Sequence, residues 1–380
     1  VGHAWSVALG SLGSSYYTIL LVTGIPEDVL GPHLAALMVL PTILTGVAVA
    51  HLEGGMASVR RGIPTILIIG GTMAGVQWVM AAVGAIQIAS VVSGLIGCGA
   101  GWLATHALLS ESPEPSTVAR TPVSTAANPH SAVGPGFHIA FLPYYLLILF
   151  SIVSQIPAVK TLGAPLQWGL DYPATESAVG YAVEAQEKYG PVGLLRHPAS
   201  LILMSMAFTY VVFRIRGIWK PGVWISASKH TYRQVASTSV AAATMLMMAL
   251  VMSDTGMTVL LGQAIAKGAG PAFAIFSPYI GVLGTFMTGS NTSSNILFGS
   301  LQLESARALD IGGVTVASAQ SIGGSLGSSI APAKVLIGTA IVGLSGRENT
   351  VLRQTIPYCL ALVLLVGLEA WVLVNLFSAL

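Results

Sequence analysis

The sequence predicts an all-α, polytopic membrane protein: a helical bundle with inverted-topology repeats and with re-entrant or broken helices. Hydrophobic residues make up 54% of the 380 residues and charged residues only 8%, against roughly 25% charged residues in soluble domains. The mean hydropathy is +0.78. Several apolar runs also reach the roughly 20 residues that a helix needs to cross a bilayer. Other apolar runs are interrupted by glycine or by polar residues.

Eight apolar runs are continuous enough to predict membrane spans. They cover residues 33–52, 64–83, 86–108, 137–156, 199–213, 235–252, 272–288 and 355–377. Four more runs are short or broken by glycine, and they lie near residues 4–22, 258–265, 295–301 and 314–344. Irregular backbone is stable at membrane depth only where protein or a water-filled cavity satisfies its polar groups. We therefore interpret the four broken runs as half-helices or re-entrant segments.

Basic residues in the loops orient the spans. Five of them occur without an acidic residue in one loop: Arg214, Arg216, Lys220, Lys229 and Arg233. The positive-inside rule places that loop in the cytoplasm. Arg60 and Arg61 mark a second cytoplasmic loop, and the four spans between the two loops make the assignment consistent. The acidic connection near residues 171–187 is then expected outside.

Four regions follow from these patterns. Residues 1–110 are predicted to form a partial first transport repeat, with its N-terminal hairpin missing. Residues 111–135 are rich in Pro and Ser, which favours a flexible cytoplasmic linker. Residues 136–233 are expected to be membrane helices with an outer polar loop. Residues 234–380 are expected to form the second transport repeat.

The predicted repeat rests on the string GSLGSS, which occurs at residues 10–15 and again at residues 324–329. The helix after the first copy ends at the Arg60-Arg61 loop, whereas the helix after the second begins just past Arg347 and Arg353. The two halves are therefore predicted to run in opposite directions. Inverted repeats place the substrate near the bilayer midplane, at the repeat interface. In the second half the string TGSNTSSN precedes GSLGSS, and its counterpart would fall before residue 1. Either the first repeat lacks this element or the N-terminus is shortened, and we favour a shortened N-terminus.

TGSNTSSN, at residues 288–295, is the most informative string. Dense polarity between two apolar runs needs partners inside the membrane. The N-terminus of a broken helix would present N–H groups that suit an anionic carboxylate, while its unwound carbonyls could instead hold Na⁺. The alternative is a helix cap or hydrogen bonds between helices. The candidate substrate-binding residues here are Ser290, Asn291, Thr292, Ser293, Ser294 and Asn295.

The two GSLGSS copies would bring hydroxyl donors and close backbone approach toward the same midplane. The alternative is packing of helices through small residues. The further substrate-binding candidates are Gly10, Ser11, Gly13, Ser14, Ser15, Gly324, Ser325, Gly327, Ser328 and Ser329.

Four other residues are candidates for coupling or for charge partnership: Asp254, Lys334, Gln320 and Tyr16. Pro332 should interrupt the helix just before Lys334. The Lys334 ammonium would attract a carboxylate if it lies deep in the bundle. If it lies near a helix end, the side chain would extend to the membrane surface instead. Asp254 is the best proton-coupling candidate, because a charge at the bilayer centre costs roughly 3 kcal/mol; the alternative is a cap at a helix end. Gln320 and Tyr16 could orient a substrate hydroxyl or satisfy nearby backbone.

Other site classes find no support in the sequence. Glu53 and Glu369 are expected at helix ends near the membrane interface. The histidines show no metal-ligand spacing, Cys98 and Cys359 lie far apart in apolar runs, and the net charge of +2 is too small for nucleic-acid binding. We therefore expect no catalytic residues, no metal, no cofactor and no nucleic acid. The sequence leaves the oligomeric state open.

Long strings at both ends resemble the L-lactate permease family. They are FSPYIGVLGTFMTGSNTSSNILFGSLQ and ASAQSIGGSLGSSIAPAKVLIGTAIVGLSGRENTVLRQT in the second half and HAWSVALGSLGSSYYTILLVTGIP in the first; the middle, from about residue 111 to 195, is less similar. The resemblance implies a multi-pass transporter, not an enzyme, that carries lactate or glycolate with protons across the prokaryotic plasma membrane. It points to residues 290–295, 10–15 and 324–329 as the site. The alternatives are a truncated, non-transporting remnant or subunit and a Na⁺-coupled carrier of another organic anion.

Overall fold

The computed structural model describes residues 2, 4–108, 136–163, 165–177, 181–193, 195, 197–219, 222–344 and 346–376. This part of the chain is mostly helical, which confirms the predicted membrane-helix class. The predicted linker at residues 111–135 lies outside the described residues.

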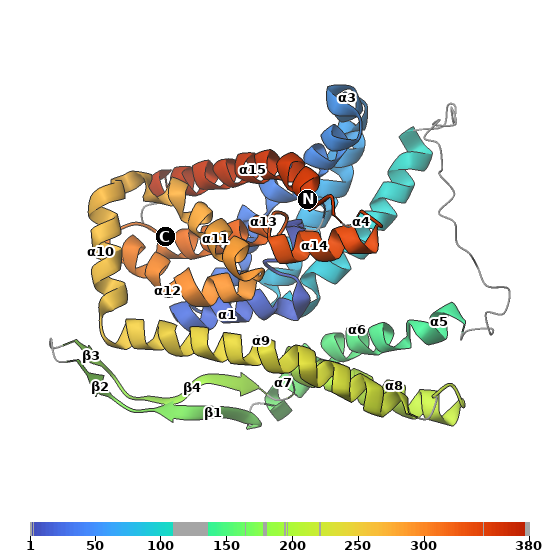
Figure 1. The fold of residues 1–380 in the computed structure, drawn as a ribbon, viewed down its shortest axis with the longest axis horizontal. Helices are drawn as coiled ribbons and strands as arrows, with labels where there is room; N and C mark the ends of the chain where they lie inside the picture. Colours follow the sequence, from blue (N-terminus) through green and yellow to red (C-terminus); the bar gives the residue numbers. More distant parts are fainter. Residues whose placement is uncertain are drawn as a thin grey trace.

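The N-terminal half contains two short 3-10 turns, η1 (Ala4–Ser6) and η2 (Ser11–Gly13), and four longer helices (Figure 1). These helices are α1 (Ser14–Thr23), α2 (Glu27–Leu37), α3 (Val39–Ala82) and α4 (Ile86–Leu108). The middle contains α5 (Phe137–Ala140), α6 (Leu142–Ser154), α7 (Pro157–Gly163), β1 (Gln167–Tyr172), β2 (Thr175–Glu176), β3 (Ala182–Val183), β4 (Gln186–Gly193) and α8 (Pro198–Ile215).

The C-terminal half is helical throughout its described part. It contains α9 (Val223–Asp254), α10 (Met257–Ala269), η3 (Gly270–Ala272), α11 (Phe273–Thr288), α12 (Asn291–Ala308), α13 (Gly313–Gly327), α14 (Pro332–Ile341) and α15 (Glu348–Leu376). In Figure 1, α11, α12 and α13 lie at the centre, with α15 along one side and α9 along the other.

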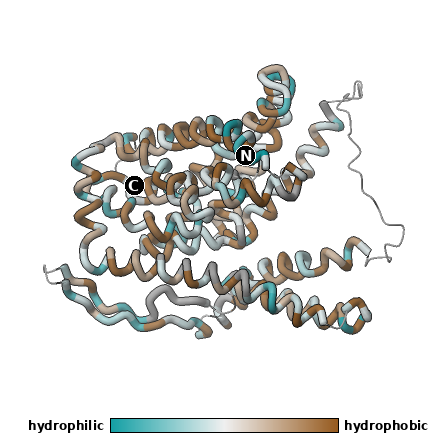
Figure 2. The backbone as a smooth tube through the Cα atoms, in the orientation of Figure 1, coloured by the Kyte–Doolittle hydropathy of each residue, from teal (hydrophilic) through white to brown (hydrophobic). Residues whose placement is uncertain are grey.

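Three helical segments in the described residues are long and apolar enough to cross a membrane, and up to five are if each bent helix pair counts as one span. One such pair joins residues 246–254 of α9 to α10 with a bend of 79°. Large apolar side chains such as Leu95, Trp102 and Ile215 point outward, and Figure 2 shows apolar residues along the outer helices. Outward-facing apolar side chains suit contact with lipid.

Helix α3 is a hairpin of two antiparallel arms. Its backbone leaves the helical region at Gly54 and Gly55, and Gly55 takes a φ of 65° that favours glycine. A Cβ built on Gly70 would lie 3.1 Å from the Cα of Ile43, whereas 27 residues of straight helix would separate the two by about 40 Å. This fold-back agrees with the two predicted spans at residues 33–52 and 64–83 and with the basic loop between them.

The acidic connection forms β strands, which the sequence analysis did not predict. β1 pairs with β4 and β2 pairs with β3, both antiparallel. The β2–β3 end lies at the left of the molecule in Figure 1, and the connection between α8 and α9 lies at the right. The hairpin strands and this basic connection are therefore at opposite ends of the bundle.

The central packing relies on glycine. A Cβ on Gly281 of α11 would lie 2.1 Å from the carbonyl oxygen of Gln320, and a Cβ on Gly323 of α13 would lie 1.9 Å from that of Pro278. These distances are far below any real Cβ contact, so the backbones of α11 and α13 approach each other only because both residues lack a side chain. This close approach fixes the position of the polar residues on both helices.

Candidate functional site

The polar string TGSNTSSN contains a short break rather than a long unwound stretch. Helix α11 ends at Thr288, and Gly289 follows with a φ of 73°, donating its N–H to the carbonyl of Thr285 at 2.8 Å. Ser290 is extended and caps α12, because its Oγ accepts the N–H of Ser293 at 3.3 Å. A left-handed glycine and a serine cap are the usual helix end and helix start. The string is thus a helix break with a capped helix start, and residues 291–295 are the first turns of α12.

Those first turns are buried and contact the first GSLGSS copy. Asn291, Ser294 and Asn295 are at most 2% exposed. The Nδ2 of Asn295 donates to the carbonyl of Ser15 and to the Oγ of Ser321, both at 3.0 Å. The hydroxyls of Ser15 and Thr292 lie 3.2 Å apart. The structure thus brings residues 291–295 together with the N-terminus of α1.

Gln320 joins the same network from α13. Its Nε2 donates to the carbonyl and the Oγ of Ser294, at 3.3 and 3.1 Å. Its Oε1 accepts the Nε2 of Gln302 at 2.9 Å, and that Nε2 also donates to the carbonyl of Ser277. Gln302 and Ser277 are not among the residues predicted from the sequence. Helical spacing could have found Gln302, which lies two turns after Asn295 on the same helix face.

The two GSLGSS copies take different conformations. In the first copy, η2 precedes α1, and Leu12 and Gly13 have positive φ angles of 56° and 78°. In the second copy, residues 324–327 form the last turn of α13. Identical sequences thus start one helix and end another, so local structure alone does not establish the repeat. The inverted repeat and the four predicted regions remain predictions.

The second copy lies beside the same cluster. Ser325 accepts the backbone N–H of Ala8 at 3.0 Å, and Ser329 donates to the carbonyl of Leu326. Ser328 accepts the Nζ of Lys334 at 2.9 Å. Lys334 is half-buried in the first turn of α14, which begins at Pro332 as the sequence predicts. The ammonium is thus held against the end of α13.

Three helix N-termini lie close to one another here. The start of α1 contacts the start of α12 through Ser15 and Thr292. The start of α14 lies against the α11–α12 break, since a Cβ on Gly289 would be 3.4 Å from the Cβ of Ala333. Helix N-termini present free N–H groups and partial positive charge, so this arrangement favours an anion. The C-terminal end of α13 adds carbonyl groups at the same place.

Several buried polar atoms in the cluster have no hydrogen-bond partner. They are the Oγ1 of Thr285, both side-chain polar atoms of Asn291 and the Oδ1 of Asn295. A Cβ on Gly324 would lie 2.0 Å from the Oδ1 of Asn291 and 3.0 Å from the Oγ1 of Thr285, so these two oxygens converge over Gly324. Buried polar atoms are seldom left unpaired. They are therefore candidates for ligand contact, and Thr285 is one that the sequence analysis missed.

Two predicted candidates have their contacts outside this cluster. Asp254 is the last residue of α9 and accepts the hydroxyl of Tyr172 on β1. Tyr16 is fully buried and donates its hydroxyl to the carbonyl of Glu27 at 2.8 Å, so it satisfies nearby backbone.

Ser14 is the first residue of α1, and its carbonyl accepts the hydroxyl of Thr18. Gly10 lies at the turn before η2, and the side chain of Ser11 lies outside the described part.

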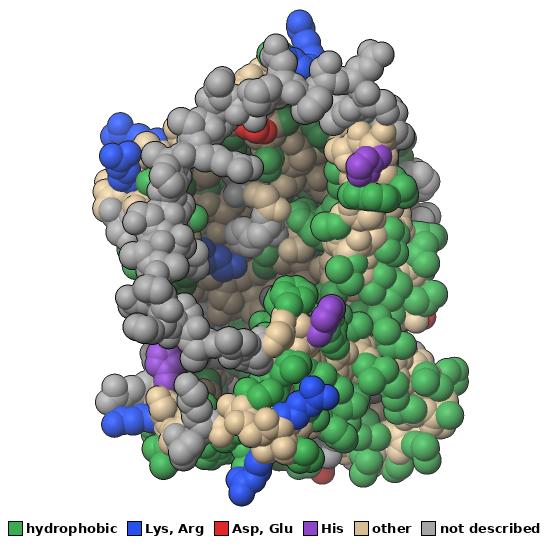
Figure 3. Space-filling model, turned by 90° about the vertical axis from the view of Figure 1, so that its right-hand side faces the viewer, with side chains coloured by type: hydrophobic (Ala, Val, Ile, Leu, Met, Phe, Trp, Pro, Cys, Tyr) green, Lys and Arg blue, Asp and Glu red, His purple; other side chains and the backbone are tan. Residues whose placement is uncertain are grey.

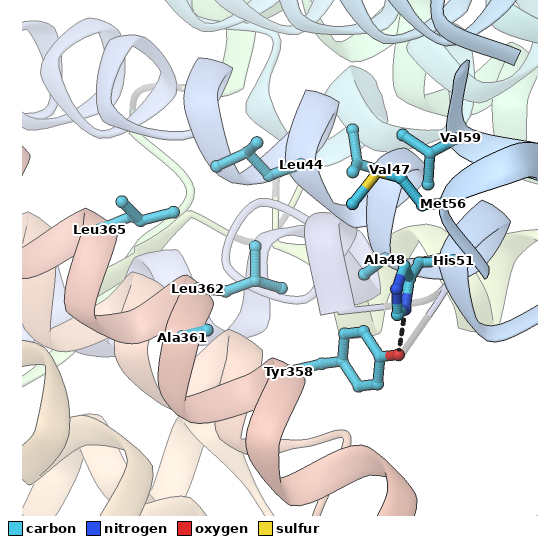
Figure 4. A pocket seen from close by; sticks show the side chains of 10 residues that line it. All are labelled: Leu44, Val47, Ala48, His51, Met56, Val59, Tyr358, Ala361, Leu362 and Leu365. Atoms are coloured by element: carbon cyan, nitrogen blue, oxygen red, sulfur yellow. Dashed lines mark hydrogen bonds between the residues drawn. The ribbon is translucent and has the colours of Figure 1, made fainter.

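A pocket of about 280 Å³ lies between α3 and α15 (Figure 4). Its lining is Leu44, Val47, Ala48, His51, Met56, Val59, Tyr358, Ala361, Leu362 and Leu365. At one edge, the Nδ1 of His51 lies 2.6 Å from the hydroxyl of Tyr358. The rest of the lining is apolar, so this pocket does not suit a carboxylate.

The face of the molecule in Figure 3 is hollowed, and a basic side chain is visible within the hollow. Among the residues that the structure describes, no group of three His, Cys, Asp or Glu side chains could hold a metal ion. The cluster itself consists of neutral hydroxyl and amide groups, with the Lys334 ammonium beside it.

Known transport proteins are similar to this chain over most of its length. The family model for L-lactate permease matches residues 2–377. An L-lactate permease of Bacillus subtilis is 27% identical over 411 residues, covering 100% of this chain and 71% of the relative. The Escherichia coli K12 L-lactate permease is 26% identical over 390 residues, covering 97% of this chain and 69% of the relative.

A shorter match reaches the glycolate permease GlcA of Escherichia coli K12, which is 37% identical over 123 residues, covering 32% of this chain and 22% of the relative. No solved structure matches. These relatives are transport proteins rather than enzymes. Because the family model covers nearly the whole sequence, this chain belongs to the L-lactate permease family.

Proposed function

We propose that this protein is a secondary active transporter of small 2-hydroxymonocarboxylates, lactate and glycolate, coupled to protons in the prokaryotic plasma membrane. The observation that carries the proposal is the meeting of the N-termini of α1 and α12 in a buried hydroxyl cluster, with Lys334 beside it. The names of the relatives, L-lactate permease and glycolate permease, support the substrate class.

The cluster offers complementary groups for both ends of such a substrate. A carboxylate would take N–H donors from the starts of α1 and α12 and charge from Lys334. The 2-hydroxyl both donates and accepts. The amide of Asn291 and the hydroxyl of Thr285, which lack protein partners, can therefore receive it.

Transport is tested with purified protein in proteoliposomes. Radiolabelled L-lactate should accumulate when the interior is alkaline, unlabelled glycolate should compete, and a protonophore should abolish the accumulation. Ser290→Ala and Asn291→Ala should each weaken uptake, because both residues stand at the start of α12. Wild-type kinetics in both variants would contradict the proposed site.

Na⁺ coupling is the second candidate. It is favoured by the oxygen atoms without partners at Thr285, Asn291 and Asn295, together with the carbonyl end of α13, because neutral oxygens are the ligands of transporter Na⁺ sites. Lactate uptake driven by an inward Na⁺ gradient at equal pH on both sides would establish it. Uptake that is independent of Na⁺ would reject it.

A further inference from the structure

Helix α15 carries an acidic side chain within a candidate membrane span. The span covers Glu348–Leu376, and Glu369 lies seven residues before its last residue, about 10 Å along the axis. Glu369 is thus two turns inside the described end of α15, and its expected position near the membrane interface stays a prediction. Glu369 is half-buried, and its Oε2 atom is buried without a hydrogen-bond partner. An acid inside a membrane span is rare and usually functional.

The other acidic residues of the described helices are at helix ends or turns, or have partners. Glu304 pairs with Arg307 at 2.6 Å. Glu348 begins α15 and accepts the N–H of Gly346 and the hydroxyl of Thr339. Of the remaining four, Asp254 is at the end of α9 and Glu53 is at the exposed turn of α3. Glu27 and Asp28 are in the first turn of α2. Glu369 is thus the acid of the described helices that lies away from helix ends and turns and has a buried oxygen without a partner.

Helix α15 connects Glu369 to the polar cluster. The Sγ of Cys359 donates at 3.4 Å to the carbonyl of Leu326, which belongs to the second GSLGSS copy. Farther along, Val374 lies 4.0 Å from where a Cβ on Gly312 would be. Helices α13 and α15 are therefore antiparallel. Glu369 lies ten residues after Cys359, which is about 15 Å along α15 from the contact with the second GSLGSS copy.

The packing around α15 is tight enough to transmit a shift. A Cβ on Gly367 would lie 2.3 Å from the carbonyl oxygen of Ile275 on α11. Helices α11 and α13 carry Thr285, Gln320 and Gly324 of the cluster. A change in the position of α15 would therefore displace the helices that form the site.

The titratable groups on the elements packed against α15 are engaged with other partners or lie at element ends. On α2, the Nε2 of His33 lies 2.9 Å from the hydroxyl of Thr315, and Glu27 and Asp28 are in the first turn. On α3, His51 contacts Tyr358 of α15, and Glu53, Arg60 and Arg61 are at or near the turn. Tyr279 of α11 donates to Leu360, and Lys334 of α14 donates to Ser328. Helix α13 has no titratable side chain.

We propose that Glu369 is the carboxylate that binds and releases the transported proton. The proposal rests on the proposed function, since it names the coupling group of that transporter. The protonated side chain is neutral and suits an apolar position, whereas the ionised one needs water or a donor. Protonation therefore favours the buried arrangement of α15, and deprotonation favours one in which the carboxylate reaches water.

The test compares two modes of transport in proteoliposomes, with Glu369→Gln as the variant. Lactate accumulation driven by an alkaline interior needs release of the proton, whereas exchange of internal for external lactate at equal pH does not. Glu369→Gln mimics the protonated form permanently. Its exchange should stay within about twofold of wild type, while its pH-driven accumulation should fall by roughly tenfold or more. Glu369→Asp should recover part of the accumulation.

Glu53→Gln, at the exposed turn of α3, is the matched control and should behave as wild type in both assays. Wild-type accumulation in Glu369→Gln would overturn the inference. Loss of both exchange and accumulation in this variant would also overturn it, because losing both assigns the side chain to folding or to lactate binding. If Asp254→Asn keeps exchange but loses pH-driven accumulation, and Glu369→Gln behaves as wild type, then Asp254 and not Glu369 is the coupling carboxylate. Wild-type protein that carries lactate in neither mode would overturn the proposed function itself.

Discussion

Asn291 is a buried amide whose oxygen and nitrogen both lack a protein partner. An unpartnered buried amide destabilises the fold, so its replacement by an apolar group of similar shape is nearly neutral or stabilising. We predict that Asn291→Leu keeps the melting temperature of wild type or raises it. Its KM for lactate should rise roughly 10- to 100-fold if the amide contacts the substrate.

Asn375→Leu is the control for that prediction, because Asn375 is exposed near the end of α15. The melting temperature is measured by thermal unfolding in detergent and the KM for lactate by uptake in proteoliposomes, on the same preparations of both variants. A lower melting temperature with unchanged KM in Asn291→Leu would show that the amide serves the fold and not the ligand.

Lys334 supplies the positive charge beside the cluster. Its Nζ donates to Ser328, so the ammonium is fixed near the end of α13. We predict that Lys334→Gln raises the KM for lactate about tenfold, because a hydrogen bond to a charged group is worth about 1.5 kcal/mol or more. Lys267→Gln, on the exposed side of α10, should leave the KM unchanged. Equal kinetics in the two variants would exclude Lys334 from substrate binding.

Residue identities in the cluster could be predicted from the sequence only where polarity interrupts an apolar run. Residues 290–295 and Lys334 stand out in this way. Thr285 and Ser277 do not, because a single small hydroxyl in an apolar helix is usual and often bonds its own backbone. Their place in the cluster depends on which face of α11 meets α13, and that orientation follows from the glycine contacts between the two helices.

At the scale of elements, α11 and α13 form the support of the cluster. A Cβ on Gly323 would lie 1.9 Å from the carbonyl oxygen of Pro278, and backbone cannot move aside as a flexible side chain can. We predict that Gly323→Ala lowers stability by about 1–3 kcal/mol or more. Gly71→Ala in α3 is the matched control, because nothing lies within 4 Å of its added Cβ and alanine favours helix.

Thermal unfolding of both glycine variants in the same detergent measures the difference. Gly71→Ala should melt at or above the wild-type temperature. If Gly323→Ala and Gly71→Ala melt at the same temperature, α11 and α13 are farther apart than the contact between Gly323 and Pro278 indicates.

The sequence predicted where elements begin and end better than it predicted their conformation. Apolar length found both arms of α3, and Pro332 located the start of α14. The helix break within residues 288–295 was predicted, but its length was not, because the buried partners of residues 291–295 on α1 and α13 are distant in the chain. The strands near residues 167–193 were also missed, although they pair with near neighbours in the chain, such as Tyr172 with Gln186 and Glu176 with Ala182.

For the whole molecule, composition alone sufficed to place the chain in a membrane, because apolar side chains must face lipid when they exceed what the interior can hold. The meeting of residues 10–15, 291–295 and 324–329 required the full fold. These segments are separated by hundreds of residues, and only the packing of α1, α12 and α13 brings them together. Alternating access would then require α12 and α13 to move relative to other helices while this cluster holds its ligand.

Topology gives the last prediction, which concerns the two ends of the bundle. The α8–α9 connection and the β2–β3 hairpin lie at opposite ends in Figure 1, and the basic residues in and beside the former predict that it is cytoplasmic. With Cys98 and Cys359 replaced by serine, single cysteines at Arg61 and Lys229 should react with an impermeant maleimide in inside-out vesicles only. A cysteine at Glu184, an exposed residue between β3 and β4, should react in right-side-out vesicles only. Labelling of Lys229→Cys and Glu184→Cys from the same side would contradict the arrangement, because one bundle cannot place both of its ends on one face of the bilayer.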